Sequence, residues 1–189
     1  MSFKCGIVGL GNPNPNNLNN RHNVGFFVID AINEKFKLSK QKPKFKGLLT
    51  TGQINEQKVY AIKPLTFMNS SGICIKELMD YFKIEAKDVF VFHDDMDIDS
   101  GKVKVKFGGS NAGHNGIESI DKNIGKHYTR IRIGIGHPKN NTTEAEHVLD
   151  NFSSNEKQNV EEVTTSIIES LPILIKKDLD LFSSKINQK

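Results

Sequence analysis

Five polar side chains in this chain of 189 residues could together carry out acid–base chemistry. They are one imidazole, one carboxylate and three amides, at His22, Asp94, Asn12, Asn69 and Asn115. A histidine with a carboxylate behind it is a plausible general base, because the carboxylate orients the ring and favours its protonated form. Amide groups can bind a peptide backbone or stabilise an oxyanion. The set predicts a hydrolytic site without a nucleophilic thiol or a metal.

The positions of three of these residues strengthen that interpretation. Asn12, Asp94 and Asn115 each lie just past the carboxyl end of an expected strand, or in the loop that follows it. Ligand crevices form at this edge in open α/β sheets. Taken singly, the residues also have ordinary structural explanations, because Asn favours turns and helix caps and a lone His is often structural.

Strands and helices alternate along the sequence around these residues. Strands are expected at 3–8, 48–54, 58–63, 89–93, 102–107 and 130–136. Helices are expected at 24–36, 70–82, 117–124 and 143–149, followed by a long helix from about 155 that Pro172 interrupts or kinks. This order predicts an α/β fold with a central mixed, mostly parallel sheet flanked by helices.

The length and composition favour one globular domain over residues 1–189, with a mobile tail from about residue 183. No apolar run approaches the roughly 18 residues that a membrane span needs, and the N-terminus lacks the pattern of a signal peptide. Cys5 and Cys74 lie among apolar residues, which predicts buried thiols and a cytoplasmic protein. The net charge of +4 permits a polyanionic partner without requiring one.

Other motifs are incomplete. Pro13 and Pro15 spoil a dinucleotide-binding turn after Gly9, and the acidic run from Asp95 lacks the glycine and glutamate of a calcium loop. The stretch 108–112 is a near miss to the nucleophile elbow of a serine hydrolase, which leaves Ser110 as a rival nucleophile.

Six stretches resemble the bacterial-type peptidyl-tRNA hydrolases, in the family's order and spacing. They are GLGNP, RHNVGF, PLTFMNSSG, HDDMD, KFGGSNAGHNG and RIRIGIGHP, between residues 7 and 138. The resemblance implies the fold expected above and hydrolysis of the ester between an N-blocked peptide and the 3′-terminal ribose of tRNA. It also implies a cytoplasmic monomer that needs no cofactor, metal, membrane or obligate protein partner.

By this resemblance, His22 activates water as the general base and Asp94 holds its imidazole in the working tautomer. Asn12 binds the peptide side and helps to distinguish a blocked amide from a free amino group. Asn69 and Asn115 bind substrate and position the water or the carbonyl.

The resemblance implies further contacts of two kinds. Phe67 would supply an apolar contact to the substrate, and Asn17 stands where many members carry a tyrosine, so that it can only hydrogen-bond. The implied contacts to tRNA phosphates are Lys104, Lys106, Arg130 and Arg132, which would make binding dependent on salt. Residues 142–149 correspond to the family's mobile lid.

Two other functions remain open on sequence alone. A non-catalytic RNA-processing protein can share this fold, although it would have no need of the complete set of site residues. A serine hydrolase acting through Ser110 is the second alternative.

Overall fold

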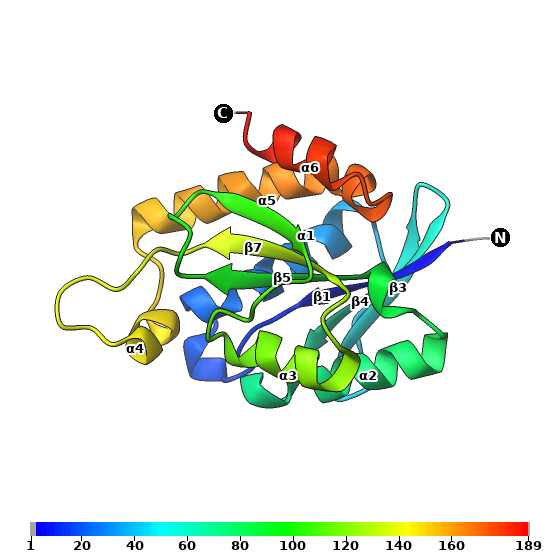
Figure 1. Cartoon of the computed structure of the whole chain (residues 1–189), viewed down its shortest axis with the longest axis horizontal. Coiled ribbons are helices and arrows are strands. Elements are labelled where there is room, and N and C mark those ends of the chain that lie inside the picture. The colour runs from blue at the N-terminus through cyan, green and yellow to red at the C-terminus, as the bar shows by residue number, and fades with distance from the viewer. Residues whose placement is uncertain (1–2, 189) are drawn as a thin grey trace.

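The structure, a computed structural model, describes residues 3–188 apart from the side chain of Asn17. Its centre is a seven-stranded sheet in the order β2-β3-β4-β1-β5-β7-β6 (Figure 1). The strands are β1 (Lys4–Gly9), β2 (Lys42–Lys44), β3 (Gly47–Ile54), β4 (Gln57–Pro64), β5 (Val89–Asp95), β6 (Val103–Phe107) and β7 (Thr129–Gly134). Strands β4, β1, β5 and β7 pair in parallel, and the three outer strands pair antiparallel with their neighbours. The predicted mixed sheet is confirmed.

Helices cover both faces of this sheet. The α-helices are α1 (Val24–Lys35), α2 (Ser71–Phe82), α3 (Asn115–Ile124), α4 (Glu144–Leu149), α5 (Ser154–Ile175) and α6 (Leu179–Ile186). Four short 3-10 turns are η1 (Pro15–Asn17), η2 (Arg21–Asn23), η3 (Met68–Ser70) and η4 (Ala86–Asp88). Helices α1, α5 and α6 lie on one face and α2 and α3 on the other, while α4 lies beyond the strand ends (Figure 1). No helix among residues 3–188 is long and apolar enough to cross a membrane.

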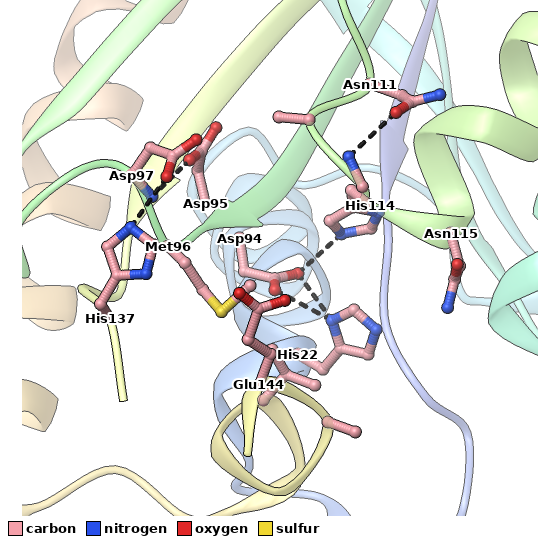
Figure 2. Close-up of a pocket in the computed structure, with 14 residues that line it drawn as sticks. His22, Asp94, Asp95, Met96, Asp97, Asn111, His114, Asn115, His137 and Glu144 are labelled. Atoms are coloured by element: carbon pink, nitrogen blue, oxygen red, sulfur yellow. Dashed lines mark hydrogen bonds and ion pairs between the residues drawn. The ribbon is translucent and has the colours of Figure 1, made fainter. Parts of the chain in front are cut away.

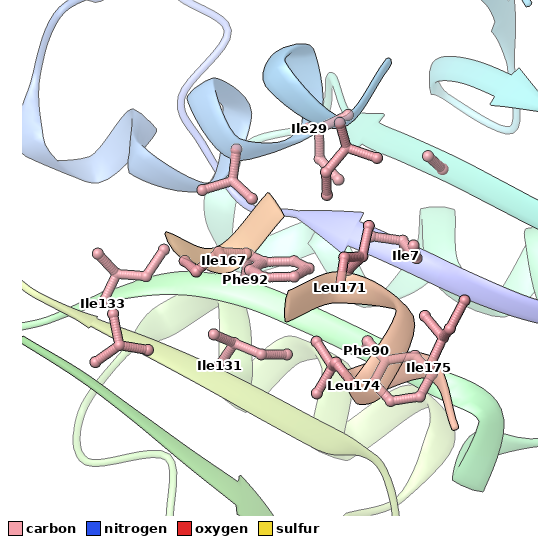
Figure 3. Packing of buried hydrophobic residues seen from close by; sticks show 14 of the residues in the cluster. Ile7, Ile29, Phe90, Phe92, Ile131, Ile133, Ile167, Leu171, Leu174 and Ile175 are labelled. Atoms are coloured by element: carbon pink, nitrogen blue, oxygen red, sulfur yellow. The ribbon is translucent and has the colours of Figure 1, made fainter. Parts of the chain in front are cut away.

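The larger hydrophobic core lies between the sheet and α1, α5 and α6. Strand β5 is buried along its whole length, as its continuous apolar run predicts for a central strand. Its Phe90 and Phe92 pack with Ile131 of β7 against Ile167 and Leu171 of α5 (Figure 3). A smaller cluster fills the space between the sheet and the α2–α3 layer.

The carboxyl-terminal region differs from the sequence-based expectation. Helix α5 continues through Pro172 without interruption, and the buried side chains around it, such as Leu171 and Leu174, offset the hydrogen bond that proline cannot make. Helix α6 was not expected. It ends at Ile186, which packs against the core, so residues 183–186 are helical, whereas a mobile tail from about residue 183 was predicted. The edge strand β2 was also missed, because its sequence KPK has no apolar pattern.

A close contact between α1 and the strand ends positions the site. A Cβ atom on Gly25 would lie 2.5 Å from the backbone of Leu10 and from the carbonyl oxygen of Phe92. Only glycine fits this approach. The start of α1, and the η2 turn before it, therefore lie against the carboxyl ends of β1 and β5.

Candidate active site

The imidazole of His22, in η2, lies against the carboxylate of Asp94 near the end of β5. Its Nδ1 is 2.9 Å from Oδ1 and 3.0 Å from Oδ2 of Asp94. Because an ionised carboxylate only accepts hydrogen bonds, Nδ1 carries the proton and Nε2 keeps the lone pair in the neutral ring. Figure 2 shows this second nitrogen turned away from Asp94. The arrangement leaves Nε2 able to take a proton from a bound water.

A second imidazole completes the surroundings of Asp94. The Nε2 atom of His114 is 2.9 Å from Asp94 Oδ1, the oxygen that His22 also contacts (Figure 2). Its Nδ1 accepts from the backbone N–H groups of Gly116 and Ile117 and thereby caps α3. Those two donors assign the Nε2–H tautomer to His114, so its ring donates to Asp94. Sequence reasoning missed His114, although it directly precedes Asn115 in the HNG motif.

Burial and charge act in opposite directions on this pair. Burial alone lowers the pKa of His22, but the charge of Asp94 and their hydrogen bond outweigh it and raise the pKa above the ordinary 6.5. Burial alone raises the pKa of Asp94, but the two imidazoles and their hydrogen bonds hold it well below its usual value. Asp94 is therefore an ionised partner that stabilises the protonated form of His22.

A third histidine lies behind the pair. His93 is buried, and its Nδ1 donates to the backbone carbonyl of Asp94 at 2.8 Å. Burial, reinforced by the nearby His114, lowers the pKa of His93 to about 3, so the ring stays neutral at physiological pH. His93 supports the backbone of Asp94 without adding charge.

The free face of His22 opens into a cavity of about 270 Å³. Asn115, at the first turn of α3, lines this cavity together with His22 and His114. Helix α4 forms another wall, through Glu144, Ala145 and Val148. The cavity lies at the carboxyl end of β5, where Asp94 and Asp95 line it, and this agrees with the crevice expected for an open α/β sheet.

The same cluster resembles a metal site in composition. One potential ligand atom each of His22, Asp94 and His114 lie within 4.8 Å of one another. Metal ligation by His114 Nε2 would, however, require its proton to move to Nδ1, which already accepts the two N–H groups that begin α3. The hydrogen-bond pattern therefore fits proton transfer better than metal binding.

Comparison with known proteins identifies the family. The sequence pattern of the family described as peptidyl-tRNA hydrolase matches residues 6–189. This chain belongs to the peptidyl-tRNA hydrolase family. A Pelagibacter ubique peptidyl-tRNA hydrolase is 66% identical over 183 residues, covering 97% of this chain and 98% of the relative. One from Bartonella henselae is 43% identical over 182 residues, covering 96% and 94%.

The fold comparison agrees. The crystal structure of peptidyl-tRNA hydrolase from Acinetobacter baumannii superposes with a TM-score of 0.92 at 32% identity, covering 99% of this chain and 96% of that one. The family, the fold class and the assignment as a hydrolase made from the sequence are thereby confirmed.

Asn12 is held beside the turn that carries His22. The resemblance to peptidyl-tRNA hydrolases assigns Asn12 to binding the peptide part of the substrate. Its backbone N–H donates to Oδ1 of the buried Asn23, the residue after His22. Its own Oδ1 accepts the backbone N–H of Asn14 at 3.1 Å. This leaves the amide NH₂ of Asn12 as the group that can donate to a ligand. The linking role of Asn23 was not foreseen.

The other expected substrate contacts occupy neighbouring, exposed positions. Asn69 lies in η3, which packs against the start of α3: a Cβ on Gly116 would be 2.6 Å from Met68 Sδ. Phe67 is 83% exposed. Asn12, Phe67 and Asn69 are not among the residues that line the His22 cavity, so the structure brings only His22, Asp94 and Asn115 together there. The side chain of Asn17 lies outside the described residues.

The four basic residues expected at tRNA phosphates divide into three groups. Lys104 and Lys106 are exposed on β6. Arg132 is partly exposed, and its Nε donates to Asp95 at 2.7 Å. Arg130 is 2% exposed, and its guanidinium binds the carboxylate of Asp121 and the carbonyl of Ser110. The prediction for Arg130 was wrong, because α3 and the preceding loop cover the part of the sheet from which it projects.

The geometry of Ser110 does not support a nucleophile. Its hydroxyl accepts the backbone N–H of Ala112 at 3.2 Å, and it makes no hydrogen bond to a histidine within residues 3–188. Gly108 and Gly109 take up positive φ angles that glycine adopts without strain. The serine-hydrolase alternative therefore lacks the base that it requires.

Proposed function

We propose that this protein, as a peptidyl-tRNA hydrolase, cleaves the ester between an N-blocked peptide and the 3′-terminal ribose of tRNA, with His22 as general base. The reaction would recycle peptidyl-tRNA released from ribosomes. The observation that carries the residue assignment is the contact of His22 Nδ1 with both oxygens of Asp94, which leaves Nε2 facing the cavity. An ester is easier to hydrolyse than an amide, so positioned water and a base can suffice.

The proposed reaction has two proton transfers, both at His22. Its Nε2 removes a proton from water while the water oxygen attacks the ester carbonyl carbon, which gives a tetrahedral oxyanion and an imidazolium. Asp94 remains ionised and stabilises that imidazolium. The bond to the ribose oxygen then breaks, and the ribose oxygen takes the proton back from Nε2. The products are a peptide with a free carboxyl group and a tRNA with a free 3′-terminal ribose hydroxyl.

Amide groups would supply the remaining contacts to the acyl group. The NH₂ group of Asn115 is suited to stabilise the oxyanion, since Asn115 lines the same cavity as His22. Asn12 offers its NH₂ group to a peptide carbonyl, which a free aminoacyl group lacks. Asn69 and Phe67 lie next to α3 and would hold the peptide by a hydrogen bond and an apolar contact.

The tRNA would be held through its backbone. We assign phosphate contacts to Lys104 and Lys106, whose exposed ammonium groups share one face of β6. Arg132 pairs with Lys104 across β6 and β7, and its partial exposure permits a further contact. Such contacts are indifferent to sequence, as an enzyme that serves all tRNAs requires.

We further propose a single-domain, cytoplasmic monomer over residues 1–189. One sheet with a core on each face supports a single domain. Cys5 and Cys74 are free thiols, as is usual in a reducing compartment. Burial raises the pKa of each to about 12, which keeps both thiols protonated and unreactive.

Cleavage of matched substrates tests this function. Purified protein is incubated with the same aminoacyl-tRNA carrying either an N-acetyl group or a free amino group. We expect release of the acetylated amino acid and much slower release of the free one, because only the acetylated substrate offers an amide carbonyl to Asn12. Equal cleavage of both, or of neither, would contradict the proposal.

A further inference from the structure

Arg21 lies in η2 immediately before His22. Its side chain connects this turn to α4, the helix that forms another wall of the His22 cavity. Its Nε donates to Glu156 Oε1 at 3.0 Å and its Nη2 to Oε2 at 2.9 Å, a two-pronged ion pair with the first turn of α5. The side chains are only 12% and 18% exposed. A pair of this geometry is among the stronger side-chain contacts in proteins.

The remaining donor of Arg21 binds the end of α4. Its Nη1 is 3.0 Å from the carbonyl oxygen of His147 and 3.4 Å from that of Asp150. The last carbonyls of a helix lack partners within the helix and carry partial negative charge, so a guanidinium is well suited to them. One side chain thus holds the end of α4 and the start of α5 at the same time.

Helix α4 has few other attachments to the rest of the protein. Its most buried residue is His147, whose Nε2 is 2.9 Å from the carbonyl oxygen of Gly136. The other residues of α4 are partly or fully exposed, and six residues are too few for a helix to be stable alone. Its position therefore depends on a small number of polar contacts, of which Arg21 provides three. Two come from its guanidinium, and the third is its backbone N–H, which donates to the carbonyl oxygen of Asp150 at 3.1 Å.

That position matters because α4 lines the cavity. Glu144 points from α4 into the space that His22 lines (Figure 2), and Ala145 and Val148 line it too. The His22–Asp94 contact itself joins η2 to β5 and does not involve the Arg21 guanidinium. A change in the Arg21 side chain can therefore move the wall while the base keeps its partner.

We propose that Arg21, held by Glu156, is a positioning residue that fixes α4 over the acyl end of the substrate and so sets substrate affinity without taking part in proton transfer. This inference rests on the proposed function for its kinetic consequences. Contacts from α4 act on substrate and transition state alike, so loosening α4 raises KM and leaves kcat unchanged.

The test uses Arg21→Lys and Glu156→Gln in the full chain. Lysine keeps the charge but cannot make the two-pronged contact, and glutamine keeps the shape of Glu156 without its charge. With N-acetylated aminoacyl-tRNA, we expect each variant to raise KM about tenfold and to leave kcat within about twofold. Backbone amides in residues 143–150 should exchange with deuterium at least about tenfold faster.

Ser153→Ala is the matched control. The Ser153 hydroxyl accepts the backbone N–H of Glu156 and caps α5, but it makes no contact with Arg21 among the hydrogen bonds of residues 3–188. We expect this variant to lower the melting temperature while KM and the exchange of residues 143–150 stay as in the wild type. If Arg21→Lys behaved like this control, Arg21 would be merely structural and the proposal would fail.

Two other results would also overturn the inference. A fall in kcat at constant KM would mean that Arg21 acts on His22, and unchanged amide exchange in residues 143–150 would mean that it does not hold α4. If the wild-type protein hydrolysed neither substrate, the proposed function would fail, and the exchange measurement would still decide whether Arg21 fixes α4.

Discussion

His114 donates from Nε2 to the same Asp94 oxygen that accepts the hydrogen bond of His22 Nδ1, at 2.9 Å in both contacts. Its other nitrogen is occupied by the start of α3. The helix thus fixes the tautomer of His114, and His114 in turn shares the charge of Asp94 with His22. Because both rings donate to the same oxygen, the basicity of His22 depends on His114 as well as on Asp94.

A substitution that separates the two roles of His114 tests this relationship. Asn caps helices well, but its shorter side chain cannot reach Asp94, so His114→Asn keeps α3 capped and frees the carboxylate. Asp94 then favours the protonated form of His22 more strongly, and the acid limb of kcat/KM against pH should move to higher pH. We expect kcat at pH 7 to fall about tenfold.

His114→Ala serves as the comparison. It should shift the acid limb in the same direction and, in addition, destabilise the protein by about 1 kcal/mol because the cap is lost. An acid limb that stayed in place in both variants would show that His114 does not share the charge of Asp94.

Replacement of Asp94 should move the same limb in the opposite direction. The pKa of His22 is raised, so the neutral base is lost in the wild type as pH falls through a value above 6.5. In Asp94→Asn the imidazolium loses its counter-charge, and the limb should shift to lower pH. The preferred tautomer is also lost, so kcat should fall by about 10³–10⁴-fold. A pH–rate profile measures both effects, and an unshifted limb would argue against the His22–Asp94 assignment.

The phosphate contacts predict a dependence on salt. Lys104→Gln combined with Lys106→Gln should weaken tRNA binding and reduce the slope of log affinity against log salt by roughly one to two, while kcat remains unchanged. Lys87→Gln is the control, since Lys87 lies in η4, at the end of β5 that is remote from Asp94. Equal slopes in all three proteins would remove β6 from the tRNA interface.

Arg130 should affect stability and not tRNA binding. Arg130→Met leaves the carboxylate of Asp121 without its cation, and breaking such a buried pair typically costs about 3–5 kcal/mol. Urea unfolding measures this loss, and tRNA affinity below the unfolding transition should keep the wild-type salt slope. A reduced slope would restore Arg130 to the interface.

The sequence predicted elements best where the local pattern and the burial agree. The run VFVFH predicted a central strand, and β5 is buried from Val89 to Asp95. Asn12 after β1 and Asp94 at the end of β5 could be placed at one edge of the sheet, because parallel strands end at the same edge.

The remaining features depend on contacts between distant segments. The burial of Arg130 arises from α3 and the loop before it, which strand alternation cannot reveal. His114 looked like a loop residue, because its role depends on how closely the start of α3 approaches β5. Arg21 meets Glu156 across 135 residues, a separation at which no local pattern is informative.

The most direct measurement is single-turnover hydrolysis of N-acetylated aminoacyl-tRNA by the wild type and by His22→Ala. His22 supplies the only base in the proposed mechanism, so its removal should slow the chemical step by about 10²–10⁴-fold. The variant should stay folded with only a modest fall in melting temperature, because His114 keeps its hydrogen bond to the buried Asp94 after His22 is removed. A folded His22→Ala variant that cleaved the substrate at the wild-type rate would contradict the account.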